Sequence, residues 1–196
     1  MKNLIPALAF MFALPAIAVA ADDAEKRAER RDTIMKMREA TLERLQKEKP
    51  ETKDIIAKAP GYAVFDATGV NLVLYVGGKG SGVLTDNATG KPTYMTMVRA
   101  GTGPGLGYKE FKQIIVFKTK GAMDMFLSAG VDVGGSFDFG NVMQQGESFN
   151  PDFSLYSITD KGFTVQANWG GTKYFKDAEL NEEAAKQEPA KQEPAK

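Results

Sequence analysis

Glycine clusters between short β-branched and aromatic runs are the feature that most limits how this chain can fold. Most of its 20 glycines lie within residues 60–141. The runs 70–76 and 111–117 carry apolar residues on both faces, as expected for strands that are covered on each side. Glycine between such runs permits bends, bulges and close approach of backbones. The region therefore predicts a bent β domain rather than an enzyme pocket.

The connections between the expected strands are mostly too short for a crossover helix, which favours antiparallel pairing. A hairpin loop is expected at 86–92, a tight turn at 160–162 and a short helix at 120–129, where apolar residues form one stripe. The predicted fold class is α+β. A long N-terminal amphipathic helix and one short helix would cover a strongly bent, Gly-rich antiparallel β-sheet, either a sandwich or a partial barrel. The expected strands are 62–66, 70–76, 81–85, 93–100, 111–117, 131–139, 153–159 and 163–169.

The first 20 residues have the pattern of a secretory signal peptide. Lys2 is followed by an apolar run and by the small residues Ala18, Val19 and Ala20. Cleavage is expected between Ala20 and Ala21, and an uncleaved anchor is the alternative. The run is shorter than the roughly 20 residues that span a bilayer. The mature protein is therefore expected in the periplasm, either soluble or peripheral to a membrane there.

Composition divides the rest of the chain into three parts. Residues 21–49 are expected to be an N-terminal amphipathic helix, starting at residue 24 with Asp22 or Asp23 as N-cap and ended by Pro50. Residues 50–181 are the β-rich domain. Residues 182–196 repeat Lys-Gln-Glu-Pro-Ala and predict a disordered spacer, with partner docking as the alternative.

The residues that most enzymes use are missing from this chain. It has no histidine and no cysteine, which excludes Ser-His-Asp and Cys-His catalysis, zinc fingers, disulfides and a lipid-modified N-terminus. Asp132 and Asp138 share a strand face, but six residues separate their backbones by roughly 20 Å, too far for a glycosidase pair. We expect no enzyme activity, no metal site and no cofactor. The formal net charge of zero also predicts no nucleic-acid partner.

Neither glycine run fits a nucleotide-binding loop. Residues 78–82 lack the final glycine of a G-x-G-x-x-G pattern and the Gly-Lys-Ser/Thr ending of a phosphate loop. Gly101, Gly103, Gly105 and Gly107 alternate with the period of a strand. Such a bare backbone face favours close packing over ligand contact.

Six segments in order resemble the SYLF family, also known as the DUF500 or yeast-type actin-binding domain. They are PGYAVF at 60–65, VGGKGSGV at 76–83, AGTGPGLG at 100–107, QIIVF at 113–117, AMDMF at 122–126 and GTKYFKDAELN at 171–181. The last segment is similar to the end of the exported bacterial branch. Asp66 departs from the family, which usually has proline there, and Thr102 and Pro104 occupy variable positions. The resemblance covers roughly residues 50–181.

The long helix has an unusual distribution of charge. At 100° per residue its acidic residues gather in one sector, while basic and apolar residues share the opposite side. Such a face suits a helix at an anionic membrane surface. In the alternative, Ile34, Leu42 and Leu45 dock on the sheet while the arginines extend to water.

SYLF domains place a basic amphipathic helix in the same position, and eukaryotic members bind anionic lipids through it. The resemblance therefore implies that Arg27, Arg30, Arg31 and Arg38 contact lipid headgroups while Ile34 and Met37 enter the interface. Actin and phosphoinositides, which other members bind, are not expected here. Two functions are predicted: a non-catalytic periplasmic protein that binds anionic lipid, or a cell-envelope scaffold that docks a protein through its sheet face or its tail.

Overall fold

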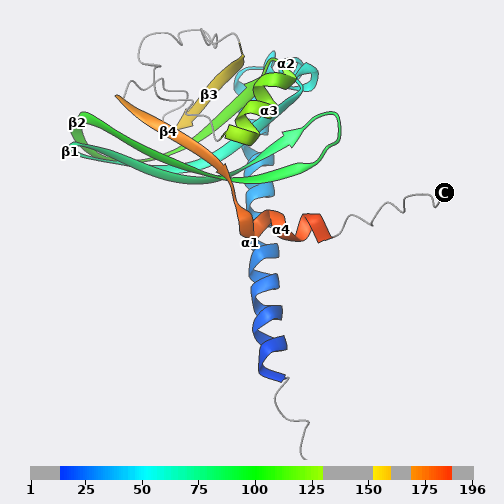
Figure 1. The fold of residues 1–196 in the computed structure, drawn as a ribbon. Coiled ribbons are helices and arrows are strands. Elements are labelled where there is room, and N and C mark those ends of the chain that lie inside the picture. Colours follow the sequence, from blue (N-terminus) through cyan, green and yellow to red (C-terminus); the bar gives the residue numbers. More distant parts are fainter. Residues whose placement is uncertain (1–13, 130–151, 160–168, 187–196) are drawn as a thin grey trace, which may run out of the picture.

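The structure, a computed structural model, describes residues 14–129, 152–159 and 169–186 (Figure 1). The expected strand 131–139 with Asp132 and Asp138, the turn 160–162, most of the strand 163–169 and the tail from residue 187 lie outside the described residues. The elements are α1 (Leu14–Glu48), α2 (Thr52–Lys58), β1 (Gly61–Asp86), β2 (Pro92–Phe117), α3 (Lys120–Ala129), β3 (Phe153–Thr159), β4 (Trp169–Lys176) and α4 (Ala178–Lys186).

The described strands form one antiparallel sheet, which confirms the predicted α+β class. β1 and β2 pair along nearly their full 26 residues. β3 pairs with the C-terminal part of β2 and β4 with its N-terminal part. Both long strands bend in the middle, at the end of the sheet farthest from α1 (Figure 1), and the register shifts between Val73 and Tyr75. The sheet is therefore folded over on itself, in agreement with the predicted strongly bent sheet.

Glycines permit the two halves of β1 to approach each other. A Cβ atom added to Gly78 would lie 2.9 Å from the carbonyl oxygen of Thr68, and one added to Gly80 would lie 2.5 Å from that of Asp66. Side chains at these positions would push the halves apart. The glycines at 78–82 thus serve close packing, the role that the sequence suggests for the alternating glycines at 101–107, which lie in β2 opposite residues 71–76.

The core has three parts, arranged on the two faces of the sheet. Between the folded halves, Phe65, Tyr174 and Phe126 of α3 stack with ring centroids 4.9–5.0 Å apart. On the outer face, Leu45 of α1 packs in a cluster with residues of β1, β2 and β3. Farther along α1, Ile34 packs with Val83 and residues of β2 and α4. α1 therefore covers one outer end of the sheet, while α3 closes the inner core.

Several predicted boundaries are wrong. α1 begins at Leu14 rather than residue 24, so Asp22 and Asp23 lie inside the helix and do not cap it, although its end at Glu48 agrees with the prediction. The expected strands at 62–66, 70–76 and 81–85 are one continuous strand, because the residues between them, including the glycines, keep their pairing with β2. The hairpin loop at 86–92 is confirmed, with Gly90 at φ 68°. The helix at Lys120–Ala129 is also confirmed.

Two short helices were not predicted. α2 connects α1 to β1, and α4 follows β4. α4 continues to Lys186, so the first five residues of the predicted spacer 182–196 are helical rather than disordered. Within the described residues, no helix has both the length and the apolar character needed to cross a membrane.

Candidate lipid-contact helix

α1 has a docked part and a projecting part. Its buried residues run from Ile34, which is 6% exposed, to Leu45, which is fully buried. Figure 1 shows the N-terminal part of α1 continuing away from the sheet beyond this contact. The apolar stripe of the helix is therefore occupied by the sheet, as in the docking alternative of the sequence analysis.

Most of the six candidate lipid-contact residues are engaged with the body of the protein. Ile34 and Met37 pack in the clusters between α1 and the sheet. Arg31 donates from Nε to the carbonyl oxygen of Leu180 at 2.9 Å, and its guanidinium lies 5.9 Å from the centre of the Tyr94 ring. Arg38 donates to the Thr85 hydroxyl at 3.2 Å, with a side chain only 15% exposed. Contact of these residues with lipid would require α1 to leave the sheet.

Arg30 is the most accessible of the four arginines. Its side chain is 50% exposed and makes ion pairs with Asp177 at 3.2 Å and with Glu179 at 2.9 Å. Arg27, one turn earlier, is partly buried. Arg31 also lies before Ile34, but its hydrogen bond to Leu180 ties it to α4. Arg30 therefore differs from Arg31 and Arg38 in its exposure rather than in its position along α1.

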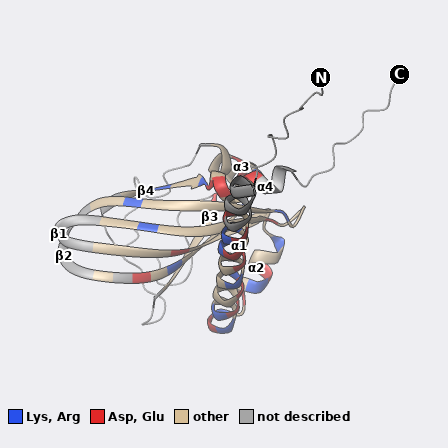
Figure 2. Ribbon diagram, turned by 90° about the horizontal axis from the view of Figure 1, so that it is seen from below, with Lys and Arg blue, Asp and Glu red and all other residues tan. Residues whose placement is uncertain are grey.

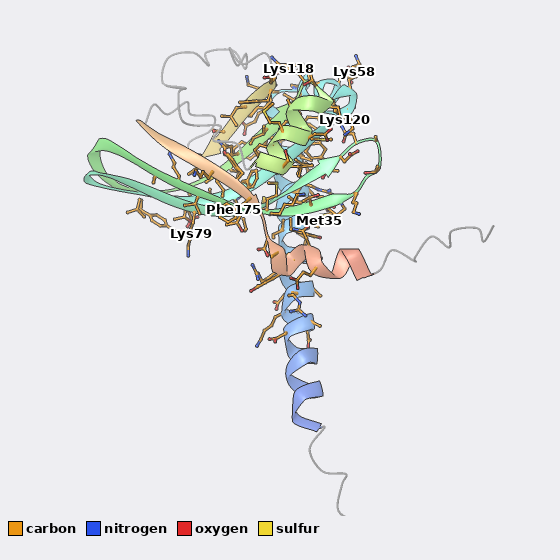
Figure 3. All side chains as sticks on the ribbon, viewed as in Figure 1. Met35, Lys58, Lys79, Lys118, Lys120 and Phe175 are labelled. Atoms are coloured by element: carbon orange, nitrogen blue, oxygen red, sulfur yellow. The ribbon has the colours of Figure 1, made fainter. Side chains whose placement is uncertain are left out.

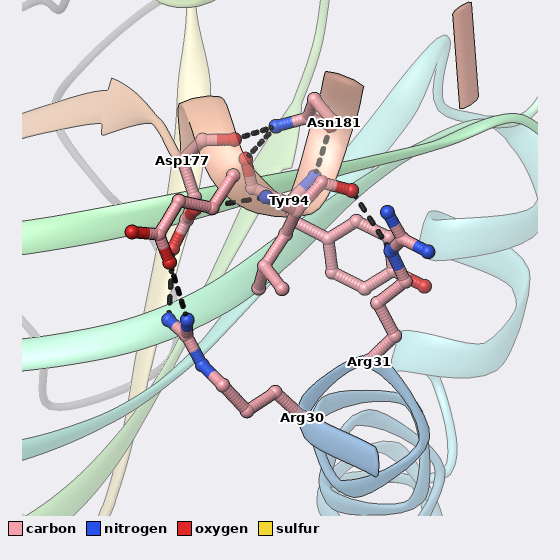
Figure 4. Close-up of polar contacts among 7 residues, drawn as sticks. Arg30, Arg31, Tyr94, Asp177 and Asn181 are labelled. Carbon is pink, nitrogen blue, oxygen red and sulfur yellow. Dashed lines mark hydrogen bonds and ion pairs between the residues drawn. The ribbon is translucent and has the colours of Figure 1, made fainter. Parts of the chain in front are cut away.

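The partners of Arg30 and Arg31 come from the other end of the chain, where α4 closes over β2 (Figure 4). Asn181 accepts a hydrogen bond from the Tyr94 backbone N–H at 3.0 Å and donates to the Tyr94 carbonyl at 2.7 Å. Asp177 caps α4 by accepting from the Leu180 N–H at 3.0 Å. We call Arg30, Arg31, Tyr94, Asp177 and Asn181 the clasp, because together they tie α1, β2 and α4.

The clasp was not predicted, although its signal was in the sequence. Asp177 and Asn181 lie in the segment 171–181 that carries the family resemblance, and Asp before Ala-Glu-Leu is a common helix start. Asp177 pairs with Arg30, 147 residues away, and Asn181 bonds the backbone of Tyr94, 87 residues away, and no local pattern reports contacts over such separations. Burial raises the pKa of Tyr94, against the opposing effect of Arg31 and Arg38, so its ring stays neutral at physiological pH.

Two shallow cavities lie near charged side chains. One of about 300 Å³ separates α1 from β1 and is lined by Glu29, Arg30, Thr33, Ile34 and Ser81. The other, of about 350 Å³, is lined by residues of α2, α3 and the hairpin loop, including Lys58 and Lys120. Lys120 contacts Asp124 at 2.7 Å, which raises the pKa of the lysine. Among the described residues no group of three acidic side chains could hold a metal ion.

The chain is similar in sequence to a curated protein. It is 36% identical over 157 residues to Beta cell expansion factor A of Aeromonas veronii. The alignment covers 79% of this chain and 60% of the relative, so the chain spans less than two thirds of that protein. No family model matches the chain.

Proposed function

We propose that the chain is an exported, non-catalytic protein of the SYLF family that binds anionic lipid at a membrane surface in the periplasm. The ordered glycine-rich segments support the family, and the name of the Aeromonas veronii relative, which mentions no reaction, is compatible with a non-catalytic role. The lack of histidine and cysteine removes most common catalytic groups. The pattern at residues 1–20 supports export.

The observation that carries the proposal is the exposure of Arg30, which is half exposed and can exchange an ion-pair partner for a lipid phosphate. The ion pair of Arg30 with Glu179 is exposed on both sides, at 50% and 71%, whereas Asp177 is only 12% exposed. An exposed pair is worth about 0–1 kcal/mol. A cation near an anionic membrane gains about 1 kcal/mol. A lipid phosphate can therefore replace Glu179 at Arg30 with little loss, whereas Arg31 and Arg38 stay with the body.

Co-sedimentation with vesicles tests the function directly. The purified chain is mixed with phosphatidylcholine vesicles, with or without phosphatidylglycerol, at low and at high salt. We expect binding to the anionic vesicles only, and weaker binding at high salt because salt screens exposed charges. Equal partition into neutral and anionic vesicles would contradict electrostatic capture.

Arg30→Gln provides the residue-level test. Loss of one cation should weaken binding to anionic vesicles by about fivefold. Arg44→Gln is the matched control, because Arg44 is also about half exposed at 42% and pairs with Glu48, but it lies in the docked part of α1. An equal loss in both variants would show that total charge, not the projecting part of α1, determines binding.

A further inference from the structure

The sheet face beside α1 is a second surface whose composition suits lipid. The registers of β1, β2 and β4 place their residues in cross-strand rows that lead away from the helix. Val83 and Tyr94 form the row under α1. The next rows are Ser81–Thr96–Phe175, Lys79–Val98–Lys173 and Gly77–Ala100–Gly171.

These rows contain both apolar and basic side chains that are exposed to solvent. Val98 is 43% exposed and Phe175 is 46% exposed, although both are large apolar residues within strands. Lys79 and Lys173 are exposed on either side of Val98. Directly opposed residues in neighbouring strands lie about 5 Å apart, so the lysines flank the valine closely.

This surface carries no acidic residue. None occurs in residues 75–81, 96–102 or 169–175, the three segments that build it. Figure 2 shows that acidic residues are instead concentrated on the helices, with few charged residues along the strands. Lysine beside exposed apolar residues such as Val98 and Phe175 is the composition of surfaces that contact the membrane interface.

We infer that this basic sheet face, defined by Lys79, Val98, Lys173 and Phe175, binds the headgroup region of an anionic membrane. The lysines attract phosphate, while Val98 and Phe175 lose water-exposed apolar area at the interface. Charge decides the occupant, because the three strand segments contribute two exposed lysines and no acid, and Glu29 at the edge of the face lies beside Arg30 in the cavity at Ser81. Such a face favours an anionic partner over a neutral one. The inference rests on the proposed function and adds a second contact to it.

The position of α1 allows a membrane to contact both the basic sheet face and the projecting part of the helix. In Figure 3, Lys79 and Phe175 point from the sheet on the side toward which α1 projects. The cavity lined by Glu29, Arg30 and Ser81 lies in the corner between helix and sheet. A flat membrane cannot fill this corner, and it would touch the outer rows of the sheet and the projecting part of α1 together.

The test compares the basic sheet face with matched surfaces elsewhere. In Lys79→Gln/Lys173→Gln, binding to phosphatidylglycerol vesicles should fall about 30-fold. Each lysine contributes about 1 kcal/mol to binding, and about 1.4 kcal/mol corresponds to a factor of ten in affinity. Lys53→Gln/Lys58→Gln removes two exposed charges from α2 and should change binding less than threefold. Val98→Ser/Phe175→Ser should also weaken binding, whereas Ile55→Ser/Met125→Ser, at residues 42% and 59% exposed, should not. Circular dichroism melting verifies the fold of each variant.

The outcomes separate the inference from the proposed function. If the unmodified chain shows no preference for anionic vesicles, the proposed function is wrong. If it binds and Lys79→Gln/Lys173→Gln binds equally well, or Lys53→Gln/Lys58→Gln loses as much, the basic sheet face is not the contact. Since both lysines are exposed, their replacement leaves the core intact and decides the matter even if Val98→Ser/Phe175→Ser does not fold.

Discussion

At the scale of single residues, the glycines of β1 show how composition determines shape. A Cβ atom on Gly80 would lie 2.5 Å from the Asp66 carbonyl oxygen and 2.8 Å from the Ala67 Cβ, closer than real Cβ contacts. The neighbouring backbone cannot move without opening the folded sheet. Sequence alone indicated a packing role for alternating glycines, but it could not show which backbone they meet.

Gly80→Ala is therefore expected to destabilise the protein by about 1–3 kcal/mol, because the added methyl group overpacks the contact between the two halves of β1. Urea unfolding followed by circular dichroism measures the change. Gly121→Ala is the control, since nothing lies within 4 Å of its added Cβ in α3. It should stabilise the protein by roughly 0.5–1 kcal/mol through helix propensity. Similar effects for both substitutions would contradict the close approach.

Tyr156 makes a second prediction at this scale. Burial, and secondarily the charge of Glu51, raise its pKa above the ordinary value of 10.0. The unfolded chain then ionises this group first, so its stabilising contribution is complete below pH of about 10 and is lost as the pH rises through the higher folded pKa. Tyr156→Phe should lose less stability than the unmodified chain between pH 9 and 11 in urea titrations. An identical pH dependence would mean that Tyr156 ionises normally.

At the scale of elements, the clasp determines how α1 sits on the body. The side chain of Asn181 makes three hydrogen bonds to backbone groups, two with Tyr94 and one with the Asp177 carbonyl. These bonds fix α4 against β2, and α4 in turn supplies the partners of Arg30 and Arg31. The segment 171–181 thus holds both ends of the chain together.

Asn181→Ala should lower the free energy of unfolding by about 1–3 kcal/mol, because the partly buried N–H of Tyr94 loses its partner and the Tyr94 carbonyl keeps only the N–H of Asp177. Glu179→Gln is the matched control in the same helix. It removes only an exposed ion pair with Arg30 and should cost less than about 1 kcal/mol. Equal losses in chemical denaturation would show that the ion pair, and not the amide, secures α4.

The elements also show what the sequence could predict. Periodicity identified α3 and the end of α1 because propensity and apolar pattern agree there. It missed α2 and α4, which are short, at 7 and 9 residues, and depend on tertiary partners. The candidate site was likewise predicted only in part. The amphipathic pattern located Ile34 and the arginines on one side of α1, but a wheel cannot tell a membrane from a sheet as the apolar partner.

At the scale of the whole molecule, the question is whether α1 stays on the sheet when lipid binds. Docked α1 buries Ile34 and Leu45 and covers parts of β1, β2 and β3. Burial of one such side chain is worth about 1.5–3 kcal/mol. Insertion of Ile34 and Met37 into a membrane would have to replace this burial and leave the sheet residues exposed. Contact through Arg30 and the basic sheet face needs no such change.

Hydrogen exchange read by mass spectrometry distinguishes the two arrangements. Without lipid, amides of residues 34–48 should exchange slowly, whereas those of 23–30, which precede the docked part, should exchange rapidly. On adding phosphatidylglycerol vesicles, we expect slower exchange at 23–30 and no change at 34–48 or around Tyr94, because the docked part keeps its packing. Phosphatidylcholine vesicles are the control and should change neither. Faster exchange at 34–48 and around Tyr94 with anionic vesicles would mean that α1 leaves the sheet, and would assign the lipid contact to Ile34 and Met37 instead.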